Sequence, residues 1–210
     1  MILHFGPGGF SAFWYNLGIG MQCKDIREIS FSGTSAGALT AWVMCFENIT
    51  FEICQESALV AKKWGNCIES YVNIFASNIQ KKGGKFNASR FSGVYAFNTC
   101  NLSSVKLTAT NPADALLQVK RSMHIPFLTA SGLTFDGYID GVCTTPTADY
   151  YVYVPFSMTS LIPLQLHINK FSQGNCSSCV VYDCPEKTVW SLILSVSNWL
   201  SSKCTYFSKT

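Results

Sequence analysis

The amino-acid sequence predicts an α/β protein with three layers, α/β/α, around a mainly parallel central sheet. Short apolar strand patterns alternate with helix patterns along the chain, a glycine-rich loop follows the first strand, and the second strand leads through a glycine turn into a helix. Such alternation favours parallel strands joined by helices that cover both faces of the sheet. The length suits one core, so we expect residues 1–210 to form a single domain.

The predicted elements follow in chain order. Strands are expected at residues 2–5, 29–32, 104–110, 150–155 and 164–168. Helices are expected at residues 11–23, after the glycine turn, at 51–64, at 67–82, from Pro112 onward, and at 188–200. Residues 86–103 are aromatic and irregular, and we expect them to form a flap over the functional site.

The turn at residues 33–37 is the most informative motif. It reads Gly-Thr-Ser-Ala-Gly between an apolar strand and an apolar helix. Gly33 and Gly37, on either side of Ser35, permit the sharp strand-to-helix turn of a nucleophile elbow. The helix N-terminus favours negative charge beside the serine hydroxyl. The structural alternative is a tight connection in which Ser35 only caps the helix.

The glycine-rich loop at residues 6–10 suits an oxyanion better than a nucleotide. No Gly-Lys-Ser/Thr follows, as a P-loop would require, and the dinucleotide fingerprint fails at Ser11. Because a candidate nucleophile lies on the next strand, the loop amides are suited to stabilise an oxyanion. The candidate oxyanion or binding residues are Gly6, Gly8, Gly9, Phe10 and Ala36. Which amides form the oxyanion hole stays open among Gly8, Gly9 and Phe10.

A serine nucleophile needs a base. His4, His124 and His167 lie in or beside apolar segments and are interpreted as structural. A carboxylate is then required, and Asp140, which a glycine follows at the end of a short apolar strand, is the candidate. Asp136 is the alternative, although with its following glycine it is also typical of a hairpin turn.

With these residues identified, the chain resembles the patatin-like phospholipase family. The resemblance spans residues 2–146 and has four ordered parts. These are the glycine loop, Ser35 in Gly-Thr-Ser-Ala-Gly, residues 122–126 as a small-x-x-x-Pro segment, and Asp140 in Tyr-Ile-Asp-Gly. The chain departs from the family's Gly-x-Gly-x-x-Gly loop, since Ser11 or Ala12, depending on register, replaces the last glycine. Val142 stands where the family commonly has a second glycine.

The resemblance implies a Ser35–Asp140 dyad without histidine, an oxyanion hole in the glycine loop, and no metal or other cofactor. It implies hydrolysis of fatty acyl esters of phospholipids or neutral lipids, with contact to a lipid or membrane interface. Two alternatives remain open. One is a catalytically silent lipid-binding or interaction protein on the same fold, and the other is a transacylase that uses an acceptor alcohol in place of water.

The composition narrows the partners and the compartment. The chain has 48% hydrophobic and 13% charged residues, a net charge of +3 and a pI near 8.3, too mild a charge to indicate nucleic acid. No basic leader precedes the first apolar run, and ten cysteines are scattered. We expect reduced thiols in a cytoplasmic protein, with peripheral contact to a membrane surface as an open alternative. Cys176, Cys179 and Cys184 lack a second pair at zinc-ribbon spacing, so no metal is expected.

Two apolar segments leave a choice between core and lipid. Three consecutive aromatic residues, Phe13, Trp14 and Tyr15, are not expected to face inward together from one helix. One or two of them are therefore expected to contact lipid or to line an acyl pocket. The helix at 188–200 is too short to span a bilayer and is expected to dock on the core, with an interfacial anchor as the alternative.

Overall fold

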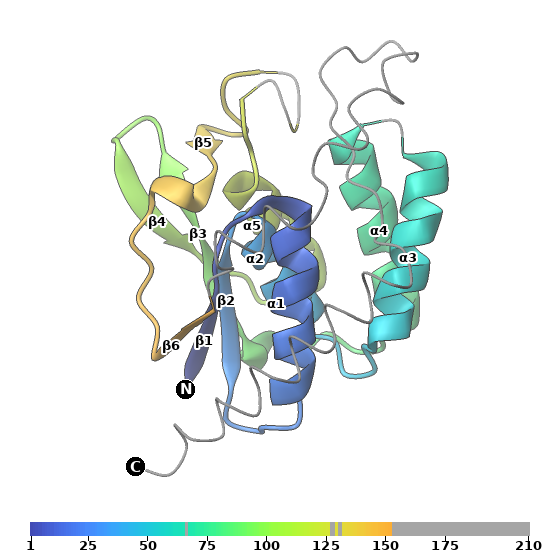
Figure 1. Cartoon of the computed structure of the whole chain (residues 1–210). Coiled ribbons are helices and arrows are strands. Elements are labelled where there is room, and N and C mark those ends of the chain that lie inside the picture. Colours follow the sequence, from blue (N-terminus) through green and yellow to red (C-terminus); the bar gives the residue numbers. More distant parts are fainter. Residues whose placement is uncertain (66, 127–128, 130–131, 153–210) are drawn as a thin grey trace.

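The computed structural model describes residues 1–152, apart from residues 66, 127–128 and 130–131. Within these residues five α-helices and one six-stranded sheet form a mixed α/β fold (Figure 1). The strands are β1 (Ile2–Phe5), β2 (Ser30–Thr34), β3 (Phe91–Asn98), β4 (Ser103–Leu107), β5 (Tyr138–Ile139) and β6 (Tyr150–Val152). The helices are α1 (Gly9–Cys23), α2 (Ala36–Val43), α3 (Phe51–Trp64), α4 (Ile68–Lys82) and α5 (Pro112–Ser122), with short 3-10 turns η1 (Ala88–Arg90) and η2 (Gly141–Cys143).

The sheet has the strand order β4-β3-β2-β1-β6, with β5 paired to β3 outside this path. Strands β6, β1, β2 and β3 run parallel, whereas β4 and β5 pair with β3 in the antiparallel sense. The predicted mainly parallel sheet is therefore confirmed. The carboxyl ends of the parallel strands meet at one edge, called here the carboxyl edge, which lies at the top of Figure 1.

The expected flap at residues 86–103 is wrong, because most of this segment is the interior strand β3 and the turn that follows it. β3 pairs with β2 on one side and with β4 on the other. Gly93 interrupts the strand pattern with a φ of 111°, next to a register shift between Phe31 and Ser32 of β2. A glycine inside a strand weakens the alternation by which strands are recognised in sequence.

Helices α1, α2 and α5 lie on the same face of the sheet. Gly20 of α1 and Gly37 of α2 both lie against Phe5 of β1, and the Trp42 indole N–H of α2 donates to the Pro112 carbonyl at the start of α5. Helices α3 and α4 form an outer pair beyond α1, to the right in Figure 1. The apolar core lies between the sheet and these two helical tiers.

The aromatic triplet of α1 is entirely buried, contrary to expectation. Phe13, Trp14 and Tyr15 are exposed by only 1%, 1% and 4%. This is possible because α1 packs against α2 on the sheet and is covered by the outer pair, α3 and α4. The Phe13 ring contacts Phe75 of α4 at 5.6 Å, and the Trp14 ring lies 6.0 Å from Phe51 of α3.

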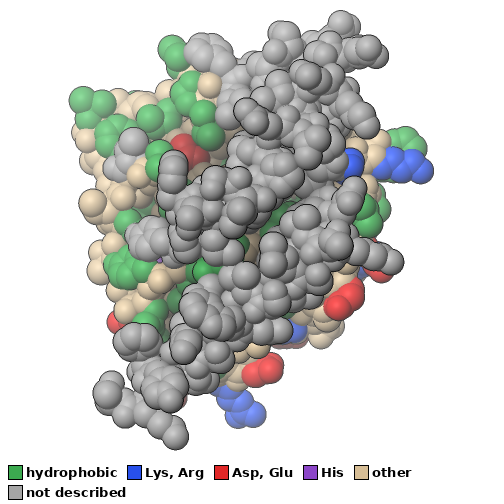
Figure 2. Space-filling view, viewed as in Figure 1, with side chains coloured by type: hydrophobic (Ala, Val, Ile, Leu, Met, Phe, Trp, Pro, Cys, Tyr) green, Lys and Arg blue, Asp and Glu red, His purple; other side chains and the backbone are tan. Residues whose placement is uncertain are grey.

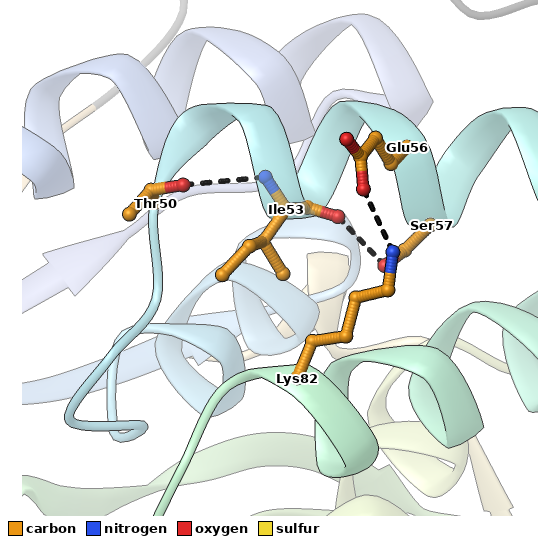
Figure 3. A network of polar contacts seen from close by, with 5 residues as sticks. All are labelled: Thr50, Ile53, Glu56, Ser57 and Lys82. Carbon is orange, nitrogen blue, oxygen red and sulfur yellow. Dashed lines mark hydrogen bonds and ion pairs between the residues drawn. The ribbon is translucent and has the colours of Figure 1, made fainter.

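Local polar contacts cap α3 and connect it to α4 (Figure 3). The Thr50 hydroxyl accepts a hydrogen bond from the Ile53 amide and so caps α3, as expected for a threonine at this position. The Ser57 hydroxyl donates to the Ile53 carbonyl within the same helix. Between the helices, Lys82 of α4 forms an ion pair with Glu56 of α3 at 2.7 Å. Because both charges are exposed, this pair contributes little to stability.

The opposite face of the sheet carries polar side chains at its centre. His4 of β1 lies between Ser32 and Thr34 of β2, with ring nitrogens 3.0 and 3.1 Å from their hydroxyl oxygens. Tyr95 lies beside them, and its hydroxyl bonds the backbone of Thr147. In the described part of the chain this face is covered by the segment that leads into β6. The predicted strand at 164–168 and helix at 188–200 lie outside the described residues.

Candidate active site

Ser35 occupies a strained turn between β2 and α2. Its φ of 55° and ψ of −126° are unfavourable for a residue with a Cβ, and it is buried, 9% exposed. The other described non-glycine residues with positive φ are Leu102 and Asp136, both in surface turns. Strain of this kind costs on the order of 1–3 kcal/mol and concentrates at functional sites. Ser35 thus occupies a sharp, strained turn between a strand and a helix.

The two elbow glycines allow a close approach of backbone segments. A Cβ at Gly33 would overlap the carbonyl group of Gly37, and a Cβ at Gly37 would overlap the carbonyl oxygen of Phe5. The first contact closes the turn on itself. The second packs the start of α2 directly against the end of β1, where the glycine loop begins. These contacts give a physical reason for a glycine at each of the two positions.

Asp140 lies beside Ser35, between β5 and η2, and is 6% exposed. Its Oδ1 accepts a hydrogen bond from the Val142 amide at 2.8 Å, while its Oδ2 is buried without a hydrogen-bond partner. Burial raises the pKa of the carboxyl, and the nearby Ser35 side chain and the Val142 amide oppose this rise. An acceptor position thus remains open on the carboxyl next to the serine hydroxyl.

One short segment at the end of α5 holds both residues in place. The Ser35 backbone N–H donates to the Ser122 hydroxyl oxygen at 3.1 Å, and the Ser122 hydroxyl donates to the Tyr95 carbonyl of β3 at 2.6 Å. Two residues on, the His124 carbonyl accepts a hydrogen bond from the Asp140 amide at 2.7 Å. Residues 122–124 therefore connect the elbow to Asp140. Sequence reasoning noted this segment through the resemblance alone and missed its structural role.

Gly141, immediately after Asp140, is fixed by packing. A Cβ at this position would overlap the carbonyl oxygen of Tyr95, and it would also approach the Thr34 side chain. The Asp-Gly pair is thus required for Asp140 to come this close to β3 and β2. The 105-residue separation along the chain is closed by strand pairing and by this contact.

The glycine loop lies at the start of α1, next to the elbow. Gly8 (φ 142°) precedes the helix and Gly9 (φ 68°) begins it. The first backbone amides of any helix lack partners within it, and here these are the amides of Gly9 and Phe10 in α1 and Ala36 in α2. Neither helix has a side-chain cap. Two helix N-termini with open amides therefore face the carboxyl edge from adjacent strands.

Gly6 is excluded as an oxyanion donor. Its amide donates to the Val152 carbonyl of β6 at 2.8 Å, and its carbonyl accepts a hydrogen bond from the Asn16 side chain at 3.0 Å. Both polar groups of Gly6 are therefore occupied in holding the loop to the sheet and to α1. Gly6, predicted among the oxyanion or binding residues, therefore has no free amide to donate, because that amide pairs with Val152, 146 residues further along the chain.

The two described histidines serve structural contacts. Burial lowers the pKa of His4 to about 4, so its ring is neutral between Ser32 and Thr34. Burial also lowers the pKa of His124, whose Nδ1 lies 3.4 Å from the Thr129 hydroxyl and whose Nε2 has no hydrogen-bond partner. Neither ring is hydrogen-bonded to Ser35 or Asp140. His167 lies outside the described residues.

The rival carboxylate, Asp136, belongs to a surface turn. Asp136 (φ 52°) and Gly137 (φ 80°) both have positive φ and connect the bridge between Phe135 and Tyr138. The Asp136 carboxylate forms an ion pair with Arg121 at 3.0 Å and is half exposed. This is the hairpin-turn geometry that a glycine-containing pair favours. Asp136 is thus positioned as a turn residue, away from the elbow contacts described above.

A small cavity lies next to residues 122–124, the segment that connects the elbow to Asp140. It has a volume of about 40 Å³ between the start of α4 and the end of α5, and it is lined mainly by apolar side chains. The His124 ring lines it together with Ile68, Val72, Met123 and Phe135. This volume holds a few water molecules and is too small for a long acyl chain.

The described residues contain neither a cluster of metal ligands nor a helix that could span a membrane. Among the described residues no three His, Cys, Asp or Glu side chains come together as a metal site would need, and Cys176, Cys179 and Cys184 lie beyond them. Each helix of residues 1–152 that the structure describes is too short or too polar to cross a bilayer. No protein-family model matches the chain, and no curated protein matches it either.

Proposed function

We propose that the protein is a serine acyl hydrolase that cleaves fatty acyl esters of phospholipids or other lipids, with a patatin-like fold and a Ser35–Asp140 dyad. The observation that carries the proposal is the strained Ser35 beside a buried carboxyl with an open acceptor oxygen. A serine that merely capped a helix would have no need of this conformation. The resemblance of the four ordered motifs to patatin-like phospholipases supports the lipid ester as substrate.

The first half-reaction forms an acyl-enzyme. Asp140 accepts the proton of the Ser35 hydroxyl as Oγ attacks the ester carbonyl carbon, and the carbonyl oxygen becomes an oxyanion. Amides at the starts of α1 and α2, from Gly8, Gly9, Phe10 and Ala36, are the available donors to that oxyanion. The C–O bond to the leaving alcohol then breaks, and Asp140 returns the proton to the alkoxide. The acyl group stays on Ser35.

The second half-reaction uses water. Asp140 accepts a proton from water as its oxygen attacks the acyl carbonyl carbon, and the proton passes to Ser35 Oγ as the acyl bond breaks. The fatty acid leaves and the dyad is restored. A carboxyl whose pKa is raised by burial is a stronger base than an exposed one, which suits both proton transfers.

Labelling with a fluorophosphonate tests this proposal directly. The reagent phosphonylates an activated serine, and peptide mass spectrometry locates the adduct. We expect the adduct on Ser35, its loss in Ser35→Ala, and its retention in Ser30→Ala, which removes another hydroxyl from the same strand. No adduct on the parent protein, or an unchanged adduct in Ser35→Ala, would contradict the proposal.

A catalytically silent lipid-binding protein is the second candidate. The observation in its favour is the altered glycine loop, in which Ser11 or Ala12 replaces a glycine and the Gly6 amide is already paired. Under this alternative the parent protein binds lipid and gives no adduct. A transacylase would give the adduct but would transfer the acyl group to an added lysolipid or monoacylglycerol faster than to water, which product analysis measures.

A further inference from the structure

Exposed apolar side chains lie on several elements at the carboxyl edge of the sheet, the edge at which the elbow also lies. Seven of the eleven large hydrophobic side chains exposed in the described part of the chain belong to elements at this edge. They are Leu59, Val60 and Trp64 at the end of α3, Leu102 in the β3–β4 turn, Ile125 and Leu133 after α5, and Val142 in η2. Scattered apolar residues are normal on a surface, whereas such a gathering marks an interaction site.

The topology brings these segments to one edge. The β3–β4 turn follows the carboxyl end of β3. The residues after α5 lead into β5, which pairs with the end of β3, and η2 follows β5. Helix α3 rises toward the same edge, and its partner α4 starts beside the end of α5, since Ile68 and Met123 line one cavity. Figure 1 shows the ends of α3 and α5 and the β3–β4 turn at the top of the molecule.

We propose that this edge, defined by the seven residues above and called the docking surface, contacts an anionic lipid bilayer. The inference rests on the proposed function, because docking at this surface would bring the elbow to a lipid substrate. The binding itself does not depend on catalysis.

The end of α3 has the chemistry of an interfacial helix. Leu59, Val60, Lys63 and Trp64 lie within one exposed arc of the helix, and the Trp64 side chain is 67% exposed. The Lys63 ammonium lies 5.1 Å from the centre of the Trp64 ring. Tryptophan is enriched at the level of lipid headgroups, and lysine extends its charge toward them from an apolar stem.

Charge favours an anionic partner over a purely apolar one. Outside the buried Asp140, the elements at this edge carry four basic side chains and two exposed acidic ones. The basic residues are Lys62, Lys63, Lys120 and Arg121, and the acidic ones are Glu69 and Asp136. The ion pair between Asp136 and Arg121 neutralises one charge of each sign, so Lys62, Lys63 and Lys120 remain against Glu69. Figure 2 shows a basic group beside hydrophobic atoms over the upper end of the outer helices, and hydrophobic atoms over the β3–β4 turn.

Vesicle binding of the Ser35→Ala protein, which cannot turn over lipid through this serine, tests the surface. We expect co-sedimentation with vesicles of phosphatidylcholine and phosphatidylserine. Trp64→Glu and Leu102→Glu should each weaken it about tenfold, because each removes exposed apolar surface that the bilayer would bury. The matched control is Ile26→Glu, an exposed isoleucine at the opposite edge, which should bind like its parent. Lys62→Gln with Lys63→Gln should weaken binding to anionic vesicles about fivefold per lysine and leave binding to phosphatidylcholine alone unchanged.

Several results would overturn the inference. One is the absence of vesicle binding, and another is an equal loss in Ile26→Glu and Trp64→Glu. A third is protection of Trp64 from iodide quenching without lipid, measured against Trp64→Phe, because another part of the chain would then cover the surface. Hydrolysis of a soluble short-chain ester by proteins with Ser35 intact separates the two proposals. The Trp64→Glu protein should still hydrolyse the soluble ester if only docking is lost. If the parent protein does not hydrolyse this ester, the proposed hydrolase function is contradicted, whereas the vesicle-binding result still stands.

Discussion

The Ser122 hydroxyl accepts a hydrogen bond from the backbone amide of Ser35 and donates one to the Tyr95 carbonyl. One buried side chain thereby fixes a strained turn against the neighbouring strand and the end of α5. The same segment holds Asp140 through the His124 carbonyl. The two halves of the proposed dyad thus share one support, although they lie far apart in the chain.

Removal of the Ser122 hydroxyl should therefore affect chemistry as well as stability. Ser122→Ala leaves the Ser35 amide and the Tyr95 carbonyl unpaired in a buried place, which costs about 1–3 kcal/mol in the free energy of unfolding. We expect kcat for a soluble ester to fall as the elbow loosens. Ser57→Ala, which removes another buried hydroxyl within α3, should leave kcat unchanged. Urea unfolding and ester kinetics measure both effects, and equal kcat in the two variants would refute the positioning role.

The elbow glycines should tolerate no side chain. Gly37→Ala places a methyl group onto the Phe5 carbonyl, so the backbone of α2 and β1 must separate. We expect a loss of more than about 3 kcal/mol in the free energy of unfolding, or failure to fold. Ala38→Gly in the same helix is the comparison and should cost about 1 kcal/mol. Thermal unfolding of the two proteins checks this, and a Gly37→Ala protein as stable as the parent would show that the close contact is absent.

His4 should make stability depend on pH. Its folded pKa of about 4 lies below the unfolded value of 6.5, so the unfolded chain binds more protons between these values. Stability is therefore complete above pH 6.5 and falls by about 3 kcal/mol as the pH drops toward 4. Asp140 acts in the opposite direction, because its folded pKa is raised and its stabilising, protonated form is lost as the pH rises.

Urea unfolding at a series of pH values separates these contributions. His4→Gln should flatten the loss of stability between pH 6.5 and 4. Asp140→Asn should be more stable than the parent at neutral pH, and the gain should shrink as the parent carboxyl becomes protonated. If His4→Gln follows the same pH dependence as the parent, His4 is not the buried neutral base described here.

Local patterns predicted much of the inner fold, and distant contacts explain the errors. The bounds of α3 match because Thr50 caps its start and Gly65 follows its end, both local signals. The elbow was likewise predictable, since Gly33, Ser35 and Gly37 define it within five residues. β3 was missed because Gly93 interrupts its pattern and because its place inside the sheet depends on pairing with β2 and β4.

The site shows the same division between local and distant information. Asp140 was proposed from its Asp-Gly turn and from resemblance, and the structure places its carboxyl beside Ser35. Gly6 was misassigned because its amide pairs with Val152, which no local pattern indicates. The support by Ser122 depends on a side chain from α5 that reaches a turn 87 residues earlier. Such contacts exist only once the strands are assembled.

The rate of Ser35 phosphonylation in two matched carboxylate variants tests the dyad most directly. Asp140→Asn removes the proposed base with little change in shape, whereas Asp136→Asn removes the exposed carboxylate that pairs with Arg121. The account predicts that Asp140→Asn slows labelling by roughly 10²–10⁴-fold, that Asp136→Asn leaves it unchanged, and that labelling of the parent rises with pH through the raised pKa of Asp140. Equal labelling rates in the parent protein and in folded Asp140→Asn would contradict it.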